Sequence, residues 1–221
     1  MNRELVITKD GSHTLFVPEL NEHYHSIFGA IQESKHVFIK EGLSYINRKN
    51  ITIFEIGLGT GLNAILTILE AIQNNFRIDY YAIEKYPLDI NIIYQLNYPE
   101  LLKLNDKEKK LFYKIHKTGW NIMTEFNRNF RLTKIKNDIT EFNIPFLYDL
   151  VYFDAFAPDK QPEMWSKNVF QKIYNNLNPK GILTTYCSKG GVKRILMSLG
   201  YQVESIPGPR GKREIIRAHK L

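Results

Sequence analysis

The chain has 221 residues, 43% of them hydrophobic, which is enough for one domain with a full core and argues against disorder. It has no apolar run of the roughly 20 residues that a membrane span needs, its start lacks the apolar segment of a secretory signal, and its one cysteine excludes a disulfide framework, so we expect a cytoplasmic protein. Thirty Lys and Arg against 23 Asp and Glu give a net charge of +7, which favours an anionic partner, nucleic acid first, although many soluble proteins are as basic.

The first fifty residues do not follow the pattern of the rest. The stretch ELVITKDGSHTLFVP predicts a β-hairpin with Asp10-Gly11 in its turn, and residues 23–46 have a helical pattern. We treat residues 1–49 as an N-terminal extension packed on a core domain of residues 50–221.

From residue 50 onward, strand patterns alternate with helix patterns. The predicted strands are 51–56, 77–84, 129–138, 147–156 and 181–187, and the predicted helices are 61–75, 87–96, 98–117, 164–177 and 190–200. Residues 201–206 and 212–220 can pair as a final antiparallel hairpin. The alternation predicts an α/β, Rossmann-like fold: a mostly parallel seven-stranded sheet with helices on both faces. In the first helix, Leu62, Ile65, Leu66, Leu69 and Ile72 share the face expected to be buried.

A glycine-rich turn follows the first core strand in the sequence IFEIGLGTGLN. Gly57 and Gly59 let the backbone turn sharply and approach a ligand, and Gly61 opens the next helix. A dinucleotide site has the spacing G-x-G-x-x-G, whereas here the third glycine comes one residue early. Glu55, just before the turn, would repel a pyrophosphate and attract an ammonium group. S-Adenosylmethionine carries a cationic amino acid end and no phosphate, so this motif suits that cofactor better.

Polar residues also end the next two predicted strands. Glu84 follows Gly61 by 23 residues, where a carboxylate can accept hydrogen bonds from both ribose hydroxyls. Asn137 and Asp138 end the third strand, where they can bind an adenine amino group. The alternative interpretation is a surface glycine turn with acids that merely terminate strands. Three polar positions at three successive strand ends favour the cofactor site.

The fourth strand ends in the sequence FDAFAPDKQPEMW, which places Asp154 beside the expected methyl group. An alkylamine with a pKa of about 10.4 is protonated at neutral pH, so a carboxylate that orients the amine and accepts its proton would assist methylation. Asp154 is therefore the predicted catalytic residue, with helix N-capping as its alternative role. Phe156 is placed to stack on a planar substrate, and Trp165 either does the same or covers the core.

Three motifs in order, EIGLGTGLN, FDAFAPDKQPEMW and GPRGKRE, resemble the methyltransferase domain of the MnmC family of tRNA-modifying enzymes. The segment YHSIFGAIQESKHVFI resembles the stand-alone members of that family. The resemblance implies methyl transfer from S-adenosylmethionine to the exocyclic amine of 5-aminomethyluridine, with or without 2-thiolation, at tRNA position 34. The family's bifunctional members also carry a flavin-dependent oxidase domain, for which this chain has no room, so we expect methylation only.

The resemblance and the motifs together give one set of predicted site residues. The catalytic residue is Asp154; cofactor binding is assigned to Glu55, Gly57, Gly59, Gly61, Asn63, Glu84, Asn137, Asp138 and Asp154, and substrate binding to Phe156, Lys160, Trp165, Arg210, Lys212 and Arg213. His25, Ser26 or Glu33 of the N-terminal segment is a further candidate for the cofactor.

Basic residues gather in GPRGKREIIR and in KGGVKR, which contribute Lys189, Lys193, Arg194, Arg210, Lys212, Arg213 and Arg217. Such residues can contact the phosphates of a tRNA anticodon loop without reading its sequence, and residues 208–211 can form a flexible lip over the site. An ordinary charged hairpin is the alternative.

The remaining candidates have plain interpretations. His23 and His25 lack a third ligand, so no metal site is expected, and we interpret Cys187 as a buried thiol. Other functions compatible with the sequence are methylation of another amine or of a protein, a non-catalytic RNA-binding module, and aminopropyl transfer. A monomer is compatible with the sequence, which is silent on oligomeric state.

Overall fold

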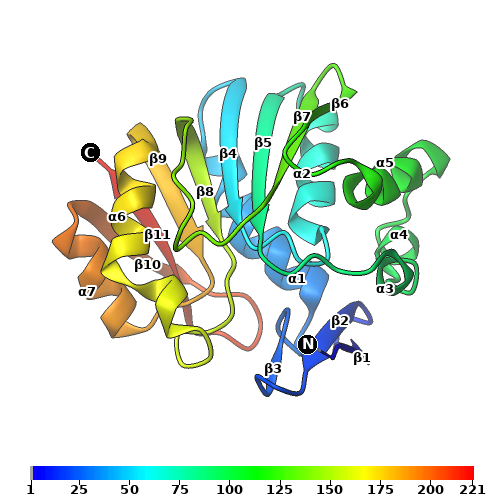
Figure 1. The fold of residues 1–221 in the computed structure, drawn as a ribbon, viewed down its shortest axis with the longest axis horizontal. Coiled ribbons are helices and arrows are strands. Elements are labelled where there is room, and N and C mark those ends of the chain that lie inside the picture. The colour runs from blue at the N-terminus through cyan, green and yellow to red at the C-terminus, as the bar shows by residue number, and fades with distance from the viewer. Residues whose placement is uncertain (1) are drawn as a thin grey trace.

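The computed structural model describes residues 2–221, which form a large central sheet, a small N-terminal sheet and helices on both faces of the large one (Figure 1). The central strands are β4 (Asn50–Ile56), β5 (Arg77–Glu84), β6 (Met123–Asn127), β7 (Phe130–Lys136), β8 (Tyr148–Phe153), β9 (Leu177–Thr185), β10 (Tyr201–Pro207) and β11 (Glu214–Lys220). Over the described residues their order is β10-β11-β9-β8-β4-β5-β7-β6. The middle strands, β9-β8-β4-β5-β7, are parallel, and β6, β10 and β11 are antiparallel to their neighbours.

The predicted fold class is confirmed, but the predicted number of seven strands is wrong. Residues 2–221 form an eight-stranded sheet, because Met123–Asn127 adds an antiparallel edge strand to β7. This strand, MTEFN, has Phe126 as its one buried residue and lacks a clear alternation. The final hairpin of β10 and β11 is confirmed.

Several predicted helices are shorter or divided. The segment 98–117 contains α4 (Tyr98–Leu101) and α5 (Asp106–Lys117), because Asn105 caps α5 in a capping box with Glu108. The segment 87–96 contains only α3 (Ile90–Ile93), and 164–177 divides into η3 (Pro162–Trp165) and α6 (Lys167–Asn176).

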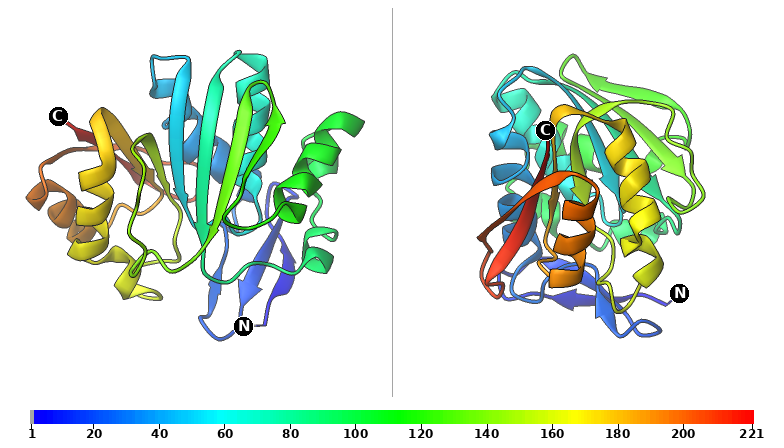
Figure 2. Two further views of the ribbon diagram at one scale, coloured as in Figure 1. Left: turned by 45° about the horizontal axis from the view of Figure 1, so that its top comes forward. Right: turned by 90° about the vertical axis from the view of Figure 1, so that its left-hand side faces the viewer.

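The sheet lies between two layers of helices, as the right view of Figure 2 shows. One core joins α2 (Leu62–Gln73), α5 and the N-terminal helical segment to one face, and the other joins α6 and α7 (Gly190–Ser198) to the opposite face. The predicted buried face of α2 needs one correction: Ile72 is 44% exposed, whereas Ile68 is fully buried. No helix within residues 2–221 is both long and apolar enough to cross a membrane.

The N-terminal region begins with the predicted hairpin of β1 (Glu4–Ile7) and β2 (His13–Val17), to which β3 (Glu22–His23) adds a third strand. This small sheet lies below the large one in Figure 1, on the side of the strands' carboxyl ends. The helical prediction for 23–46 is correct only from Ala30: α1 (Ala30–Ser34), the π-helix η1 (Lys35–Lys40) and the 3₁₀ turn η2 (Leu43–Tyr45). Residues 24–29 have no helical structure.

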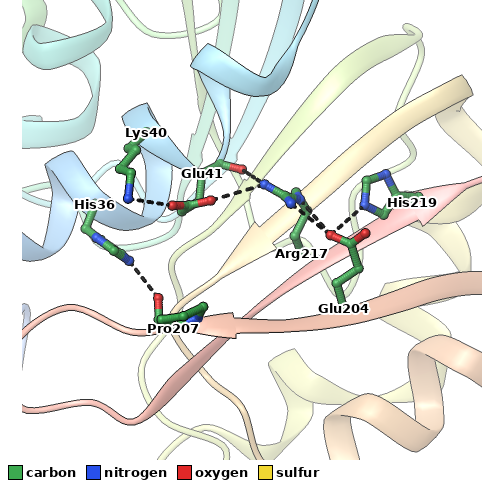
Figure 3. Close-up of polar contacts among 7 residues, drawn as sticks. All are labelled: His36, Lys40, Glu41, Glu204, Pro207, Arg217 and His219. Carbon is green, nitrogen blue, oxygen red and sulfur yellow. Dashed lines mark hydrogen bonds and ion pairs between the residues drawn. The ribbon is translucent and has the colours of Figure 1, made fainter.

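An ion-pair network joins the N-terminal region to the final hairpin (Figure 3). Arg217 of β11, 9% exposed, lies between Glu41 (Nη1–Oε2 3.2 Å) and Glu204 (Nη2–Oε2 2.9 Å). His36 of η1 donates from Nε2 to the carbonyl oxygen of Pro207 at 2.8 Å. These contacts fix η1 against β10 and β11. They therefore hold α1, which directly precedes η1, beside the turn between β10 and β11.

Candidate active site

A cavity of about 600 Å³ opens at the carboxyl ends of β4, β5, β7 and β8, where a doubly wound sheet binds its ligands. Its other side is closed by Leu20, residues 22–28, Glu33 and the turn at Lys212. Ten predicted site residues line it: Gly57, Gly59, Asn63, Glu84, Asn137, Asp138, Asp154, Phe156, Lys160 and Lys212. The other five, Glu55, Gly61, Trp165, Arg210 and Arg213, are not among the residues that line it.

The glycine turn has the conformation that its sequence predicts. Gly57, Gly59 and Gly61 all have positive φ, at +90°, +48° and +71°. A Cβ on Gly57 would lie 2.7 Å from the carbonyl oxygen of Asp154. Glycine is therefore required at position 57 for the backbone conformation and for the close approach of the ends of β4 and β8. Gly61 is the N-cap of α2 and is not among the residues that line the cavity.

Glu84 holds this turn through its carboxylate. Oε2 accepts a hydrogen bond from the backbone N–H of Gly59 at 3.0 Å, and Oε1 accepts one from that of Tyr86 at 2.8 Å. In a phosphate-binding turn the amide at such a position would face the phosphate. In this structure the Glu84 carboxylate occupies the position in front of the Gly59 amide. A carboxylate has about four acceptor positions, so Glu84 retains capacity for the hydroxyl groups of a ligand in the cavity.

Asp138 is engaged by a lysine that follows β5 and by its own loop. Its carboxylate forms an ion pair with Lys85 at 2.7 Å and accepts hydrogen bonds from the backbone N–H and hydroxyl of Thr140 at 2.8 and 2.7 Å. Burial alone would raise the pKa of Asp138, but Lys85 and Thr140 bring that pKa below its usual value. Asn137, which lines the cavity beside it, is exposed.

Asp154 lies at the end of β8 and accepts a hydrogen bond on Oδ2 from Asn63 Nδ2 at 2.9 Å. Burial, and then the negative charge of Glu33, raise the pKa of Asp154 to about 7, while Asn63 and Lys212 oppose that rise. A carboxyl group with a pKa near neutrality can accept and release a proton at physiological pH. The alternative role as a helix cap is not realised, because Ser166 caps α6.

The predicted aromatic residues have different positions. Phe156 lines the cavity, with its ring centroid 5.0 Å from that of Tyr24 in an edge-to-face contact. Trp165 is only 4% exposed and donates from Nε1 to the carbonyl oxygen of Phe156 at 2.7 Å, so it packs in the core and is not part of the cavity wall. The structure adds Tyr24 and Tyr186 to the cavity wall. Tyr186 directly follows Thr185, the last residue of β9, so the rule that ligands lie at strand ends would have found it.

The N-terminal candidates, His25, Ser26 and Glu33, all line the cavity. Burial lowers the pKa of His25 to about 4, so its imidazole is neutral at physiological pH. Glu33 is 7% exposed; its Oε2 accepts a hydrogen bond from the backbone N–H of Ser26 at 2.8 Å, and its Oε1 lies 3.4 Å from Lys212 Nζ.

Glu55 lies behind the cavity rather than in its wall. Its side chain is fully buried, and neither carboxyl oxygen has a hydrogen-bond partner among residues 2–221. Burial, opposed by Asn63 and reinforced by the charge of Asp154, raises the pKa of Glu55 well above its usual value. Glu55 therefore lies outside the cavity wall, and its predicted contact with the cofactor stays a prediction.

The charge of the cavity fits a cationic cofactor. The described residues that line it include six acids, Glu22, Glu33, Glu84, Asp138, Asp154 and Glu163, against the three lysines Lys85, Lys160 and Lys212. This acidic lining occurs in a chain whose net charge is +7. With the Gly59 amide already bound to Glu84, the turn offers little to a pyrophosphate. S-Adenosylmethionine, with a sulfonium, an ammonium group and ribose hydroxyls, matches this set of acidic acceptors.

Comparisons with known proteins agree with this geometry. The family described as S-adenosyl-L-methionine-dependent methyltransferase matches residues 102–221, more than half of the chain. The chain is 30% identical over 211 residues to the tRNA 5-methylaminomethyl-2-thiouridine biosynthesis bifunctional protein MnmC of Leptospira interrogans, and 29% identical over 213 residues to that of Pseudomonas fluorescens. In both cases 90% of this chain matches but only 32% of the relative, so the chain spans about a third of the length of these curated relatives.

A solved structure, that of MNMC2 from Aquifex aeolicus, superposes with a TM-score of 0.78 at 28% identity. The match covers 98% of this chain and 69% of the Aquifex chain. It therefore includes the N-terminal region as well as the central sheet.

Proposed function

Since the chain belongs to the S-adenosyl-L-methionine-dependent methyltransferases, we propose that it methylates the exocyclic amine of 5-aminomethyluridine, or of its 2-thio form, at wobble position 34 of cytoplasmic tRNA. The relatives named MnmC support the tRNA substrate by their printed name, which specifies 5-methylaminomethyl-2-thiouridine biosynthesis. Because the chain matches only 32% of those proteins, this proposal includes the methyl transfer and none of their other activity.

The observation that carries the proposal is the position of Asp154, a carboxylate with a pKa of about 7 in an acidic cavity at the end of β8. The bound cofactor supplies an electrophilic methyl group. The chain's own residues must then hold the acceptor amine and remove its proton. Asp154 can orient the amine through a hydrogen bond and accept its proton, and Asn63 fixes the carboxylate for that purpose.

The cofactor would be held by residues of the glycine turn and the adjacent strand ends. Gly57 and Gly59 allow close backbone approach, Glu84 offers acceptors for ribose hydroxyls, and Asn137 borders the cavity where the adenine would lie. Phe156 and Tyr24 present aromatic surface on which an unpaired base can stack.

The RNA backbone would lie over the C-terminal hairpin. Arg210 and Arg213 are exposed on the turn that carries Lys212 into the cavity wall. Cations there can neutralise anticodon-loop phosphates without reading bases. An unpaired wobble base enters a pocket at lower cost than a base taken out of a duplex.

The decisive experiment is mass spectrometry of wobble uridine after tRNA from a methylation-deficient strain is incubated with the protein and S-adenosylmethionine. We expect the aminomethyl nucleoside to gain one methyl group. No gain with normal cofactor binding would favour another amine or protein substrate, and absence of cofactor binding by calorimetry would favour an RNA-binding module.

A further inference from the structure

We propose that Glu33 and the face of Tyr186 form a binding subsite for a primary alkylammonium group, which Lys212 of the same chain occupies until the amine of the substrate replaces it. The inference deepens the proposed amine methylation and rests on it. It assigns recognition of the incoming ammonium to residues other than Asp154.

The two walls of this subsite come from opposite ends of the sequence. Glu33 of α1 is 7% exposed and lines the cavity. Tyr186 follows β9, and its hydroxyl donates to the carbonyl oxygen of Ala155 at 2.8 Å, which fixes the ring next to the segment that carries Asp154. Lys212 Nζ lies 3.4 Å from Glu33 Oε1 and 4.4 Å from the centroid of the Tyr186 ring. A carboxylate together with an aromatic face is a favourable environment for an ammonium ion.

The fit of Lys212 to Glu33 is loose. Charge-assisted N–H···O hydrogen bonds are usually about 2.7–2.9 Å long, whereas this ion pair is 3.4 Å long. Glu33 Oε1 is buried and has no hydrogen-bond partner among the described residues. The carboxylate therefore retains an unused acceptor position that faces a cation. A primary ammonium group that approached more closely would form the bond that Lys212 does not form.

The charge of the cavity requires a cation at this position. Glu33 and Asp154 line one cavity, and the charge of Glu33 contributes to the raised pKa of Asp154, while Lys212 opposes that rise. If Lys212 left without replacement, Glu33 would stay buried and uncompensated, which is costly. An exchange of one primary ammonium for another avoids that cost and brings the substrate amine into the cavity that Asp154 also lines.

The turn that carries Lys212 is anchored, so the exchange needs only side-chain motion. Gly211 has φ +90°, and a Cβ there would lie 2.2 Å from the Phe28 ring, so the turn packs directly against the N-terminal segment. The backbone N–H of Lys212 donates to the carbonyl oxygen of Pro209 at 2.9 Å. The lysine side chain has a flexible four-carbon stem, and once released its charge is available to a phosphate at the rim of the cavity.

The proposed subsite should select its ligand by charge. It should prefer an aminomethyl group, which is cationic at neutral pH, over a hydroxymethyl group of similar size, which is neutral. The probes are therefore the nucleosides 5-aminomethyluridine and 5-hydroxymethyluridine, titrated at pH 7 into the protein saturated with S-adenosylhomocysteine. The wild-type protein should bind the amine roughly tenfold more tightly, because it adds a charge-assisted hydrogen bond.

Two variants test the two roles. Glu33→Gln should weaken binding of the amine roughly tenfold, leave binding of the hydroxymethyl nucleoside unchanged, and leave S-adenosylhomocysteine affinity unchanged. Lys212→Met keeps most of the aliphatic stem and removes the competing cation, so it should tighten binding of the amine several-fold. Lys107→Met, an equal loss of charge at an exposed position of α5, is the matched control and should bind both probes like the wild type.

A third pair of variants tests the aromatic wall. Tyr186→Phe keeps the ring face and should retain amine binding, whereas Tyr186→Leu should weaken it about threefold to tenfold through loss of the cation–π contact. Thermal unfolding of each variant shows whether it is folded before binding is measured.

The subsite is overturned if the wild-type protein does not bind the amine more tightly than the hydroxymethyl nucleoside, or if Lys212→Met binds the amine no better than the wild type. It is also overturned if Glu33→Gln weakens both probes equally. The tRNA methylation assay decides the proposed function separately: a protein that methylates tRNA and fails the binding tests keeps its function and loses the subsite.

Discussion

Asn63 Nδ2 lies 2.9 Å from Asp154 Oδ2, which joins the first turn of α2 to the end of β8. This hydrogen bond links the side of the site expected to hold the cofactor to the carboxylate expected to accept the amine proton. The start of α2 and the acid at the end of β8 thus form one unit, although Asn63 and Asp154 stand 91 positions apart in the sequence.

Replacement of Asp154 by Asn should preserve cofactor binding and remove most turnover. The amide is similar in shape but cannot accept the amine proton, and loss of a general base typically lowers kcat by roughly 10²–10⁴-fold. The measurement is single-turnover methylation of tRNA, together with calorimetric titration of S-adenosylhomocysteine. Asp159→Asn, a change at an exposed ion pair with Lys189, is the control. Methylation by Asp154→Asn at the parental rate would show that Asp154 is not the base.

Replacement of Asn63 by Leu should move the pH dependence of methylation upward. The hydrogen bond from Asn63 favours the ionised form of Asp154 and so lowers its pKa; without it the pKa should rise above about 7. Because the ionised carboxylate is the base, the rising limb of kcat/KM should move to higher pH. The variant should be impaired at pH 7 and should recover toward pH 9. Asn74→Ala, at the exposed C-terminal end of the same helix, should leave the profile unchanged, and an unshifted profile in Asn63→Leu would contradict the assignment.

Replacement of Glu84 by Gln should weaken the cofactor site. Each carboxylate oxygen accepts one backbone N–H, from Gly59 and from Tyr86. A glutamine can serve one of these donors and would point its own amide hydrogens at the other. Loss of a hydrogen bond to a charged group costs about 1.5–3 kcal/mol, which is roughly a tenfold to hundredfold increase in Kd for S-adenosylhomocysteine. Glu100→Gln on α4, exposed and remote from the cavity, provides the comparison, and an equal Kd in both variants would rule out this role of Glu84.

Replacement of Arg217 by Met should destabilise the protein. The substitution leaves Glu41 and Glu204 without their shared cation and removes the guanidinium from the face of Tyr45, 3.7 Å away. We expect the free energy of unfolding to fall by roughly 1–3 kcal/mol, since the partly buried Glu41 and Glu204 keep only the weaker partners Lys40 and His219. Urea unfolding at pH 7 measures this. Arg131→Met breaks an ion pair with Asp79 that is 50% and 36% exposed, and should cost less than about 1 kcal/mol; equal losses in the two variants would refute the argument.

The sequence predicted the part of the site that follows from local rules. Gly57, Glu84 and Asp154 each stand at the end of a strand, and the carboxyl ends of parallel strands meet at one edge, so their proximity followed from the alternation of elements. The position of Glu55 outside the cavity wall did not follow from this rule, because successive side chains of a strand point to opposite faces. Its side chain is buried near Asn63 and Tyr80 and is not part of the cavity wall.

The remaining residues depend on contacts that no local pattern encodes. Glu33, Tyr186 and Lys212 come from three separate elements, and their meeting depends on how the N-terminal region docks on the last hairpin. Trp165 shows a related difficulty: an aromatic residue beside a functional motif has the same sequence signal whether it packs in the core or faces a ligand. The extra strand β6 was missed because an exposed edge strand needs little apolar alternation.

The network around Arg217 also determines when the cavity can be completed. During synthesis the glycine turn, Glu84 and Asp154 leave the ribosome before Lys212 and Arg217 do, so a nascent chain can assemble the half of the site made by the sheet while the opposite wall still lacks Lys212. Only when β11 enters the sheet and Arg217 joins Glu41 to Glu204 do Glu33 and Lys212 come together. Newly made chains should therefore complete the cavity wall that faces the strand ends only after β11 is in place.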